Sequence, residues 1–338
     1  MGNTTLEVLL PLIYIIPSLI LYVMELIIMI CYRSNTKFTG SFFTIFVCSA
    51  INNIFCEIFY FLTYRATKVP IFASFFSSFS DSGFFITLPT FITYIAGAAQ
   101  AMLDFCICFN RFTVFYLGAK HVEFWRRWCK IILIVVYIIA AGITWEAWVF
   151  KVKITPVDPL QIDSGFNWGI TDPNVIPWIK VPLLIAGNVI ITASWSFMMN
   201  LYVCWFLLKR KTTKKNTGFS ISSSDVRLFS FNLLIFLTQA TQFFLQMIFL
   251  FSPKERAIYS FTVKIQFVVM DINCLASAWF ILLTSSPLRK AIFRLIFCRV
   301  FDNKIHFLKK LSSNVSGPKK RVQTAPPTIT IFRTVNLH

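Results

Sequence analysis

The hydrophobic residues of this chain gather in long runs, and most charged residues lie between the runs or in the tail. A helix rises about 1.5 Å per residue, so roughly 20 apolar residues are needed to cross a hydrocarbon core about 30 Å thick. The runs that meet this length are Val8–Tyr32, Phe38–Tyr64, Gly83–Leu117, Trp128–Phe150, Trp178–Leu208, Leu228–Phe251 and Tyr259–Thr284. The pattern predicts an all-α membrane protein whose bundle of seven transmembrane helices covers residues 8–284. The third helix is the longest, and we expect it to tilt or to protrude from the bilayer.

The composition supports a lipid environment. Of the 338 residues, 57% are apolar and only 14% are charged, which leaves too little polar surface for a soluble domain of this length. The nine cysteines lie almost entirely inside or beside the apolar runs, where a thiol behaves as a small hydrophobic group. These observations exclude a soluble globular domain, a disordered chain and a secreted module held together by disulfides.

Lys and Arg are distributed unevenly between the two sides of the predicted bundle. If the N-terminus lies outside, the cytoplasmic segments hold 24 of the 32 basic residues. These segments are Arg33–Lys37, Gly118–Lys130 together with Arg111, Lys209–Arg227 and the tail from Ser285. Because cytoplasmic loops are enriched in basic residues, we place the N-terminus outside and the tail inside. Residues 1–7 are then extracellular, and Asn3 lies in a glycosylation sequon on that side.

The basic residues of the cytoplasmic side are explained by membrane lipids. Anionic headgroups attract each of them by about 1 kcal/mol near the surface, and nucleic acid is not an expected partner because no basic and aromatic residues alternate on a polar fold. Residues 285–301 mix apolar and basic side chains as an amphipathic helix on the inner leaflet would, and Cys298 is a candidate for acylation. Residues 302–338 are predicted to form a disordered cytoplasmic tail.

Several predicted spans carry polar side chains, which are costly at bilayer depth and are therefore expected to face the bundle interior. In the third span, six positions fall within about an 80° arc of the helix surface: Thr90, Thr93, Gly97, Gln100, Asp104 and Arg111. In the sixth span, four amides share one face: Asn232, Gln239, Gln242 and Gln246. In the seventh, Lys264 and Asp271 are seven residues apart and also share a face.

Two interpretations of these stripes stay open. The side chains either hold the helices together, at roughly 0.6 kcal/mol for each interhelical hydrogen bond, or they line a cleft that binds a small molecule from outside. The candidate ligand-binding residues are Thr90, Thr93, Gln100, Gln239, Gln242, Gln246 and Asp271. Lys264 is interpreted as reaching the outer headgroups, although a lysine on this helix also suits a Schiff base with an aldehyde ligand.

The sequence holds no recognisable catalytic constellation. Its histidines, His121, His306 and His338, lie in an inner loop and in the tail, away from acids or cysteines at metal-ligand spacing. Glycine-rich phosphate loops and nucleophile elbows are also missing from the sequence. We therefore expect a protein that is not an enzyme and that uses no cofactor or metal.

The inner end of the third span carries Asn110, Arg111 and Phe112. An arginine one turn from the interface can pair inward or reach a partner's helix terminus, as a two-state switch requires. Seven spans, an outside N-terminus and this arginine together resemble a G-protein-coupled receptor. More narrowly, the 39 Phe residues, the stretch Pro17–Tyr22, the sequence Phe109–Thr113 and Trp125–Arg127 resemble nematode chemoreceptors of serpentine receptor class gamma or class V.

This resemblance covers about residues 8–300 and implies detection of a small environmental or pheromone molecule in sensory neurons. It also implies signalling through a heterotrimeric G protein, with Asp104, Asn110 and Arg111 as the coupling and switch residues. The chain departs from the rhodopsin-like pattern, because Asn110 stands where an acid usually precedes the arginine. The alternative is a transporter or a ligand-gated cation channel with seven spans, and a seven-span channel of the insect odorant type would place the N-terminus inside.

Overall fold

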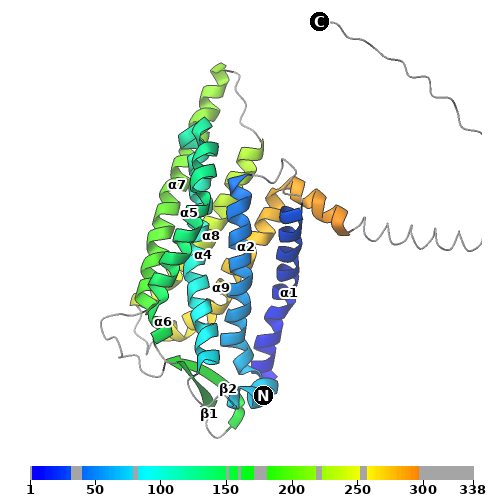
Figure 1. Ribbon diagram of the computed structural model, residues 1–338, viewed down its shortest axis with the longest axis vertical. Helices are drawn as coiled ribbons and strands as arrows, with labels where there is room; N and C mark the ends of the chain where they lie inside the picture. Colours follow the sequence, from blue (N-terminus) through cyan, green and yellow to red (C-terminus); the bar gives the residue numbers. More distant parts are fainter. Residues whose placement is uncertain are drawn as a thin grey trace, which may run out of the picture. The chain divides into compact units, whose positions relative to one another are not determined.

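The computed structural model describes residues 2–31, 40–78, 83–149, 152–158, 161–170, 181–217, 223–251 and 257–296. Residues up to Ile292 form one compact unit, a bundle of long helices with a two-stranded hairpin at one end (Figure 1). The long helices are α1 (Gly2–Cys31), α2 (Ser41–Tyr60), α4 (Phe84–Leu117), α5 (His121–Thr144), α7 (Val181–Thr217), α8 (Ser223–Phe251) and α9 (Ala257–Thr284).

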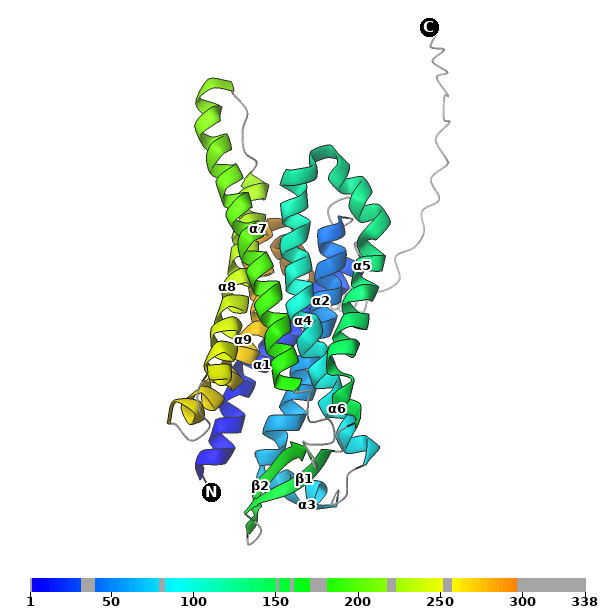
Figure 2. The ribbon, with the colours of Figure 1, turned by 90° about the vertical axis from the view of Figure 1, so that its left-hand side faces the viewer.

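Six helical stretches of the described chain are long and apolar enough to cross a membrane. One of them, Phe84–Thr144, is 61 residues long and makes two crossings, because the chain reverses in the short turn Gly118–Lys120 between α4 and α5. Gly118 has a φ of +54° in this turn, a backbone conformation that glycine adopts more readily than residues with a side chain. Figure 2 shows α4 and α5 as antiparallel neighbours. The predicted bundle of seven transmembrane helices is therefore confirmed.

The longest helix is α7, with 37 residues, and not the third span. Its predicted span ended at Leu208, but the helix continues through basic residues to Thr217, beyond its neighbours in Figure 2. Lys and Arg are good helix formers, and the segment from Lys209 to Thr217 contains no Gly or Pro. The predicted inner loop Lys209–Arg227 is thus helical at both ends, because α8 begins at Ser223.

The C-terminal end of α2 departs from regular α-helix. It passes into a π-helical turn, η1 (Phe61–Arg65), and then into a 3-10 turn, η2 (Ala66–Lys68). A second 3-10 turn, η3 (Pro70–Phe72), leads into the short helix α3 (Ala73–Ser77). A π turn inserts extra backbone and rotates the side chains that follow it. Arg65, the last residue of η1, is buried as a result of this path.

A hairpin occupies the segment between α5 and α7, where the sequence predicted only a loop. Strands β1 (Val152–Asp158) and β2 (Gln161–Ile170) are antiparallel, with Val152 opposite Ile170. Val152 and Ile154 are buried while Lys153 is exposed, which is the alternation of a strand with one covered face. Two alternating positions were too short a signal to be detected among the long apolar runs.

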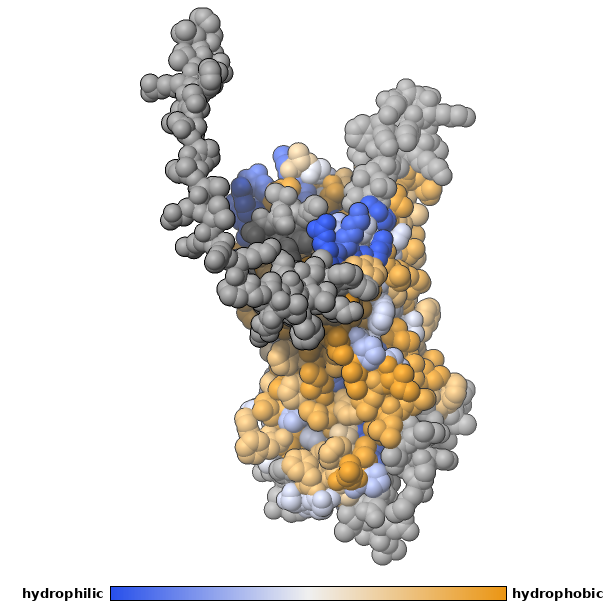
Figure 3. Space-filling view, turned by 90° about the vertical axis from the view of Figure 1, so that its right-hand side faces the viewer, coloured by the Kyte–Doolittle hydropathy of each residue, from blue (hydrophilic) through white to orange (hydrophobic). Residues whose placement is uncertain are grey.

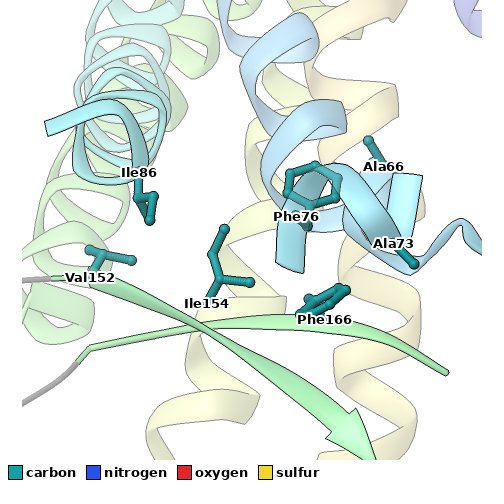
Figure 4. Close-up of a cluster of buried hydrophobic side chains, with 7 residues drawn as sticks. All are labelled: Ala66, Ala73, Phe76, Ile86, Val152, Ile154 and Phe166. Carbon is teal, nitrogen blue, oxygen red and sulfur yellow. The ribbon is translucent and has the colours of Figure 1, made fainter. Parts of the chain in front are cut away.

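The hairpin closes this end of the bundle through an apolar cluster (Figure 4). Its members come from η2, α3, α4 and both strands: Ala66, Ala73, Phe76, Ile86, Val152, Ile154 and Phe166. Gly165 of β2 has a φ of +88°, and a Cβ there would lie 2.9 Å from the Cα of Lys68. A glycine is required at this position both by its backbone conformation and by the close approach of β2 to η2.

The outward surface of the bundle is apolar. Large side chains such as Ile13, Ile138 and Leu201 are exposed, and Figure 3 shows hydrophobic residues covering most of the described flank. Such a surface suits lipid, not water, so the chain is a multi-pass membrane protein. After α9 the chain is helical again from 286 to 296, where Leu288 and Ile292 are buried. Cys298 and the predicted tail lie outside the described residues.

Candidate functional site

The first candidate region lies on α4 and α8. We call it the α4–α8 stripe and define it as Thr90, Thr93, Gln100, Gln239, Gln242 and Gln246. Both threonines are buried, and their hydroxyls donate to carbonyls one turn earlier in α4, Ile86 O at 3.5 Å and Pro89 O at 2.8 Å. Bonds of this kind satisfy the hydroxyl donor within its own helix, so these threonines offer mainly oxygen lone pairs to a ligand.

The amides of the stripe join α4, α8 and α9. Gln239 Nε2 donates to Ala101 O at 3.0 Å, and Asn273 Nδ2 donates to Gln242 Oε1 at 3.1 Å. Gln100 Oε1 accepts a longer bond, 3.7 Å, from the Cys274 thiol. The other ends of two of these amides, Gln100 Nε2 and Gln239 Oε1, are buried without a hydrogen-bond partner. Unsatisfied buried groups of this kind are where an unseen water or ligand is expected. Gln246 is half-exposed.

Asp271 of α9 does not belong to this stripe in the structure. Its Oδ2 accepts a hydrogen bond from Arg65 Nη2 at 2.6 Å and another from the Tyr14 hydroxyl of α1. The sequence pattern paired Asp271 with Lys264 on the same helix face, and the structure pairs it with a residue 206 positions away. The side chain of Lys264 lies outside the described part of α9.

Asp271 belongs to a second polar region, which we call the α1–α2–α9 seam. We define it as Tyr14, Tyr22, Asn53, Glu57, Arg65, Asp271 and Ser277. The Tyr22 hydroxyl donates to Cys274 O at 2.6 Å and contacts the Ser277 hydroxyl. Asn53 Nδ2 donates to the Tyr22 oxygen at 3.1 Å. The seam therefore links the three helices through side chains that are distant in the sequence.

Sequence reasoning missed Arg65, because a basic residue directly after a predicted span is usually an interface anchor. The structure instead makes Arg65 about 95% buried, since only 5% of it is exposed. The π turn that directs it inward leaves no clear trace in the hydrophobic pattern. A carboxylate in the second span, Glu57, was the available signal, because a buried acid demands a partner.

At the end of the bundle away from the hairpin, Arg111 lies over the ring of Phe42, with 4.0 Å between the guanidinium carbon and the ring centre. Phe42 of α2 in turn contacts Phe231 of α8, edge to face at 5.6 Å. Asn110 Nδ2 donates to the Ser41 hydroxyl at 2.9 Å. Arg111 and Asn110 thus connect α4 to the start of α2, and through Phe42 to α8.

The remaining sequence candidates are less informative. Asp104 is buried in α4, seven residues before Arg111. Asn3 lies in the first turns of α1, where the structure describes the backbone only. Among the described residues, no three His, Cys, Asp or Glu side chains are grouped so that they could hold a metal ion. The polar interior offers hydrogen-bond donors, acceptors and charge, and these are the means of binding a small molecule.

Comparison with known proteins identifies the family of this chain. The model of the Srg family chemoreceptors matches residues 8–292, which includes all seven spans. This chain belongs to the Srg family chemoreceptors. A relative from Caenorhabditis elegans, described as serpentine receptor class gamma-10, is 24% identical over 183 residues. That alignment covers 51% of this chain and 51% of the relative, so the chain spans about half the length of the curated relative it matches.

The family assignment decides between the two receptor classes that the sequence left open. The match is to class gamma, and the resemblance seen in the Phe-rich spans and in the residues around Arg111 is confirmed.

Proposed function

We propose that this Srg chemoreceptor binds a small environmental or pheromone molecule from the extracellular side and signals through a heterotrimeric G protein. The plasma membrane of sensory neurons, including their cilia, is its proposed location. The observation that carries the proposal is the inner-end contact chain from Arg111 through Phe42 to Phe231. It joins α4, α2 and α8 through side chains that can separate without breaking a helix.

The contact of Arg111 with Phe42 suits a switch. Phe42 is buried and Arg111 is half-buried, so their cation–π contact contributes about 1–2 kcal/mol, which is larger than thermal energy and small enough for a ligand to overcome. Ligand binding changes such an equilibrium only by its difference in affinity for the two states. Asp104 lies between Arg111 and the half-satisfied Gln100 along α4, and we propose these three as the route from ligand to inner face.

For ligand recognition we propose the α4–α8 stripe together with Asp271. Gln100 Nε2 and Gln239 Oε1 supply one unpartnered donor and one unpartnered acceptor. A hydroxyl or amide group of a ligand could bond to both, because it can accept from Gln100 Nε2 and donate to Gln239 Oε1. Thr90, Thr93, Gln242 and Gln246 would then line the path towards the outer end.

Replacement of Arg111 tests the switch. In cells that express the receptor with a G-protein reporter, Arg111→Ala is expected to lower the agonist response at least about tenfold, because the guanidinium that ligand binding frees from Phe42 is proposed to reach the G protein. Surface expression should persist. Arg126→Ala, an exposed arginine of α5, is the matched control and should respond like the unmodified receptor. A full response from Arg111→Ala would show that the switch lies elsewhere.

Topology separates the receptor from the rival channel or transporter. Epitope tags at the two ends, stained on intact cells, should be accessible at the N-terminus only. Glycosylation at Asn3 provides an independent readout, since Asn3→Gln should remove a glycosidase-sensitive mass shift. An accessible C-terminal tag together with an inaccessible N-terminal tag would favour the channel.

A further inference from the structure

The outer part of the α1–α2–α9 seam holds three formal charges in close contact. Arg65 donates to Asp271 at 2.6 Å, and its other terminal nitrogen, Nη1, lies 4.0 Å from Glu57 Oε1. Each of the three residues is at least about 95% buried. Two carboxyl groups share one guanidinium here. A second negative charge beside Asp271 is strongly disfavoured in a medium of low dielectric constant unless a second cation joins the cluster.

The cluster also has more hydrogen-bond acceptors than donors. Three carboxylate oxygens, Glu57 Oε1, Glu57 Oε2 and Asp271 Oδ1, are buried without a hydrogen-bond partner, against one donor, Arg65 Nη1. The neighbouring Cys274 thiol is a weak donor, and it is shared between Glu57 and Gln100. The cluster therefore lacks donors and positive charge, and it has acceptors in surplus.

Aromatic rings surround the same place. The ring of Phe267 lies 5.8 Å from the Arg65 guanidinium carbon and 5.9 Å from the ring of Tyr60, which also packs against Tyr64 at 4.9 Å. Aromatic faces attract cations, and this attraction is strongest where water is excluded. Tyr14, whose hydroxyl covers Asp271, is 41% exposed and forms the open edge of the cluster.

We propose that this cluster is the binding site for a ligand that carries a protonated primary amine on an apolar or aromatic body. The inference rests on the proposed receptor function and names the chemical class of its ligand. A primary ammonium has three N–H donors, which equals the number of unpartnered carboxylate oxygens. An anionic ligand would instead raise the buried negative excess and bring further acceptors.

Arg65 occupies this site as a tethered cation when no ligand is bound. An incoming ammonium takes over Asp271 and Glu57, and the Arg65 guanidinium moves away from Asp271. Because Arg65 is the ion-pair link between the end of α2 and the middle of α9, its displacement separates these two helices. The competition also lowers the apparent affinity of the unmodified receptor, in proportion to the fraction of molecules whose site is open.

The test measures the thermal midpoint of the purified receptor with three probes of similar shape: phenethylamine, phenethyl alcohol and phenylacetate. Arg65→Gln removes the tethered cation, so phenethylamine should stabilise this variant at a concentration at least about tenfold lower than it needs for the unmodified receptor. The alcohol and the acid should have no comparable effect. Lys68→Gln, which removes an outer cation bonded to Asn167, is the matched control and should behave like the unmodified receptor.

Two further variants make the outcome specific. Arg65→Lys keeps a tethered cation and should cancel most of the gain in amine affinity. If Arg65→Gln does not fold, the test uses the unmodified receptor, where stabilisation by a high concentration of phenethylamine should be lost in Asp271→Asn. Arg65→Gln combined with Asp271→Asn should lose the response to phenethylamine. Equal stabilisation by the alcohol, or a preference for the acid, would overturn the inference.

The failure of this inference can be told apart from failure of the proposed function. Thermal stabilisation does not require signalling. If phenethylamine binds but no G-protein response to any compound is found, the ligand class stands and the proposed function is wrong. If another compound activates the reporter while amines leave the thermal midpoint of Arg65→Gln unchanged, the function stands and the amine site is wrong.

Discussion

Side chains of the α1–α2–α9 seam bond to one another across three helices, whereas those of the α4–α8 stripe bond mainly to backbone carbonyls. In the seam, Arg65 and Asp271 each depend on the other for charge compensation. In the stripe, the amide of Gln239 uses one end to hold α4 and leaves the other end unpartnered. A charged network loses much when one member is removed, while a neutral amide loses little.

The difference separates two tasks that buried polar groups perform in a membrane. The seam holds α1 and α9 against α2 through an ion pair and hydrogen bonds, and it contributes strongly to the stability of the ligand-free receptor. The stripe contributes less to holding the helices and keeps hydrogen-bonding capacity for something else. Substitutions should therefore produce stability effects in the seam that are larger than those in the stripe.

The largest effect is expected for Asp271→Ala, which removes the 2.6 Å partner of the buried Arg65 guanidinium and leaves it only Glu57 at 4.0 Å. Breaking a buried ion pair in this way costs about 3–5 kcal/mol, and we expect a large loss of folded receptor in a detergent thermal-unfolding assay. Asp271→Ala combined with Arg65→Leu should recover part of this loss, because no uncompensated cation remains. Equal yields of the single variant and the unmodified receptor would contradict the ion pair.

Gly165→Ala tests how closely the hairpin lies over the outer end of the seam. The positive φ and the 2.9 Å approach to the Cα of Lys68 predict a penalty of about 1–3 kcal/mol. Faster proteolysis of the hairpin on intact cells is the readout. Gly97→Ala in α4 is the control, because nothing lies within 4 Å of the position that its Cβ would take, and it should be neutral or slightly stabilising.

Tyr22→Phe removes one hydroxyl from the middle of the seam. Cys274 O and Asn53 Nδ2 each lose a partner, so a destabilisation of about 1–2 kcal/mol is expected. Thermal unfolding in the same detergent measures it. Tyr116→Phe, at an exposed position of α4, is the control and should change the thermal midpoint little. If both variants lower the midpoint equally, the hydrogen bonds of the Tyr22 hydroxyl do not contribute specifically to stability.

The smallest stability effect is expected for Gln239→Leu in the stripe. It removes a bond to Ala101 O, which in a membrane is worth about 0.6 kcal/mol, and it also removes an unsatisfied oxygen. The thermal midpoint should therefore stay close to that of the unmodified receptor, while the agonist concentration for half-maximal response rises. A large loss of stability with an unchanged response would assign the stripe to packing.

The hydrophobic pattern located α4 and its polar face well. Thr90, Thr93, Gln100 and Asp104 were placed on one arc, and all four are buried. This worked because the 100° step of a helix converts sequence spacing directly into a direction. The same reasoning missed the hairpin, where strand alternation is only two or three residues long, and it ended α7 at Leu208 instead of Thr217 because charge does not by itself end a helix.

The sequence by itself determined the number of crossings, the segments that carry the basic residues and the face of each helix that turns inward. These follow from run length, charge and period, which are local quantities. Only the tertiary structure decided that Asp271 pairs with Arg65 and Tyr14 instead of Lys264. Helical periodicity predicts the direction in which a side chain points. The residue with which that side chain pairs depends on how the helices pack and, for Arg65, on the π turn that directs it into the bundle.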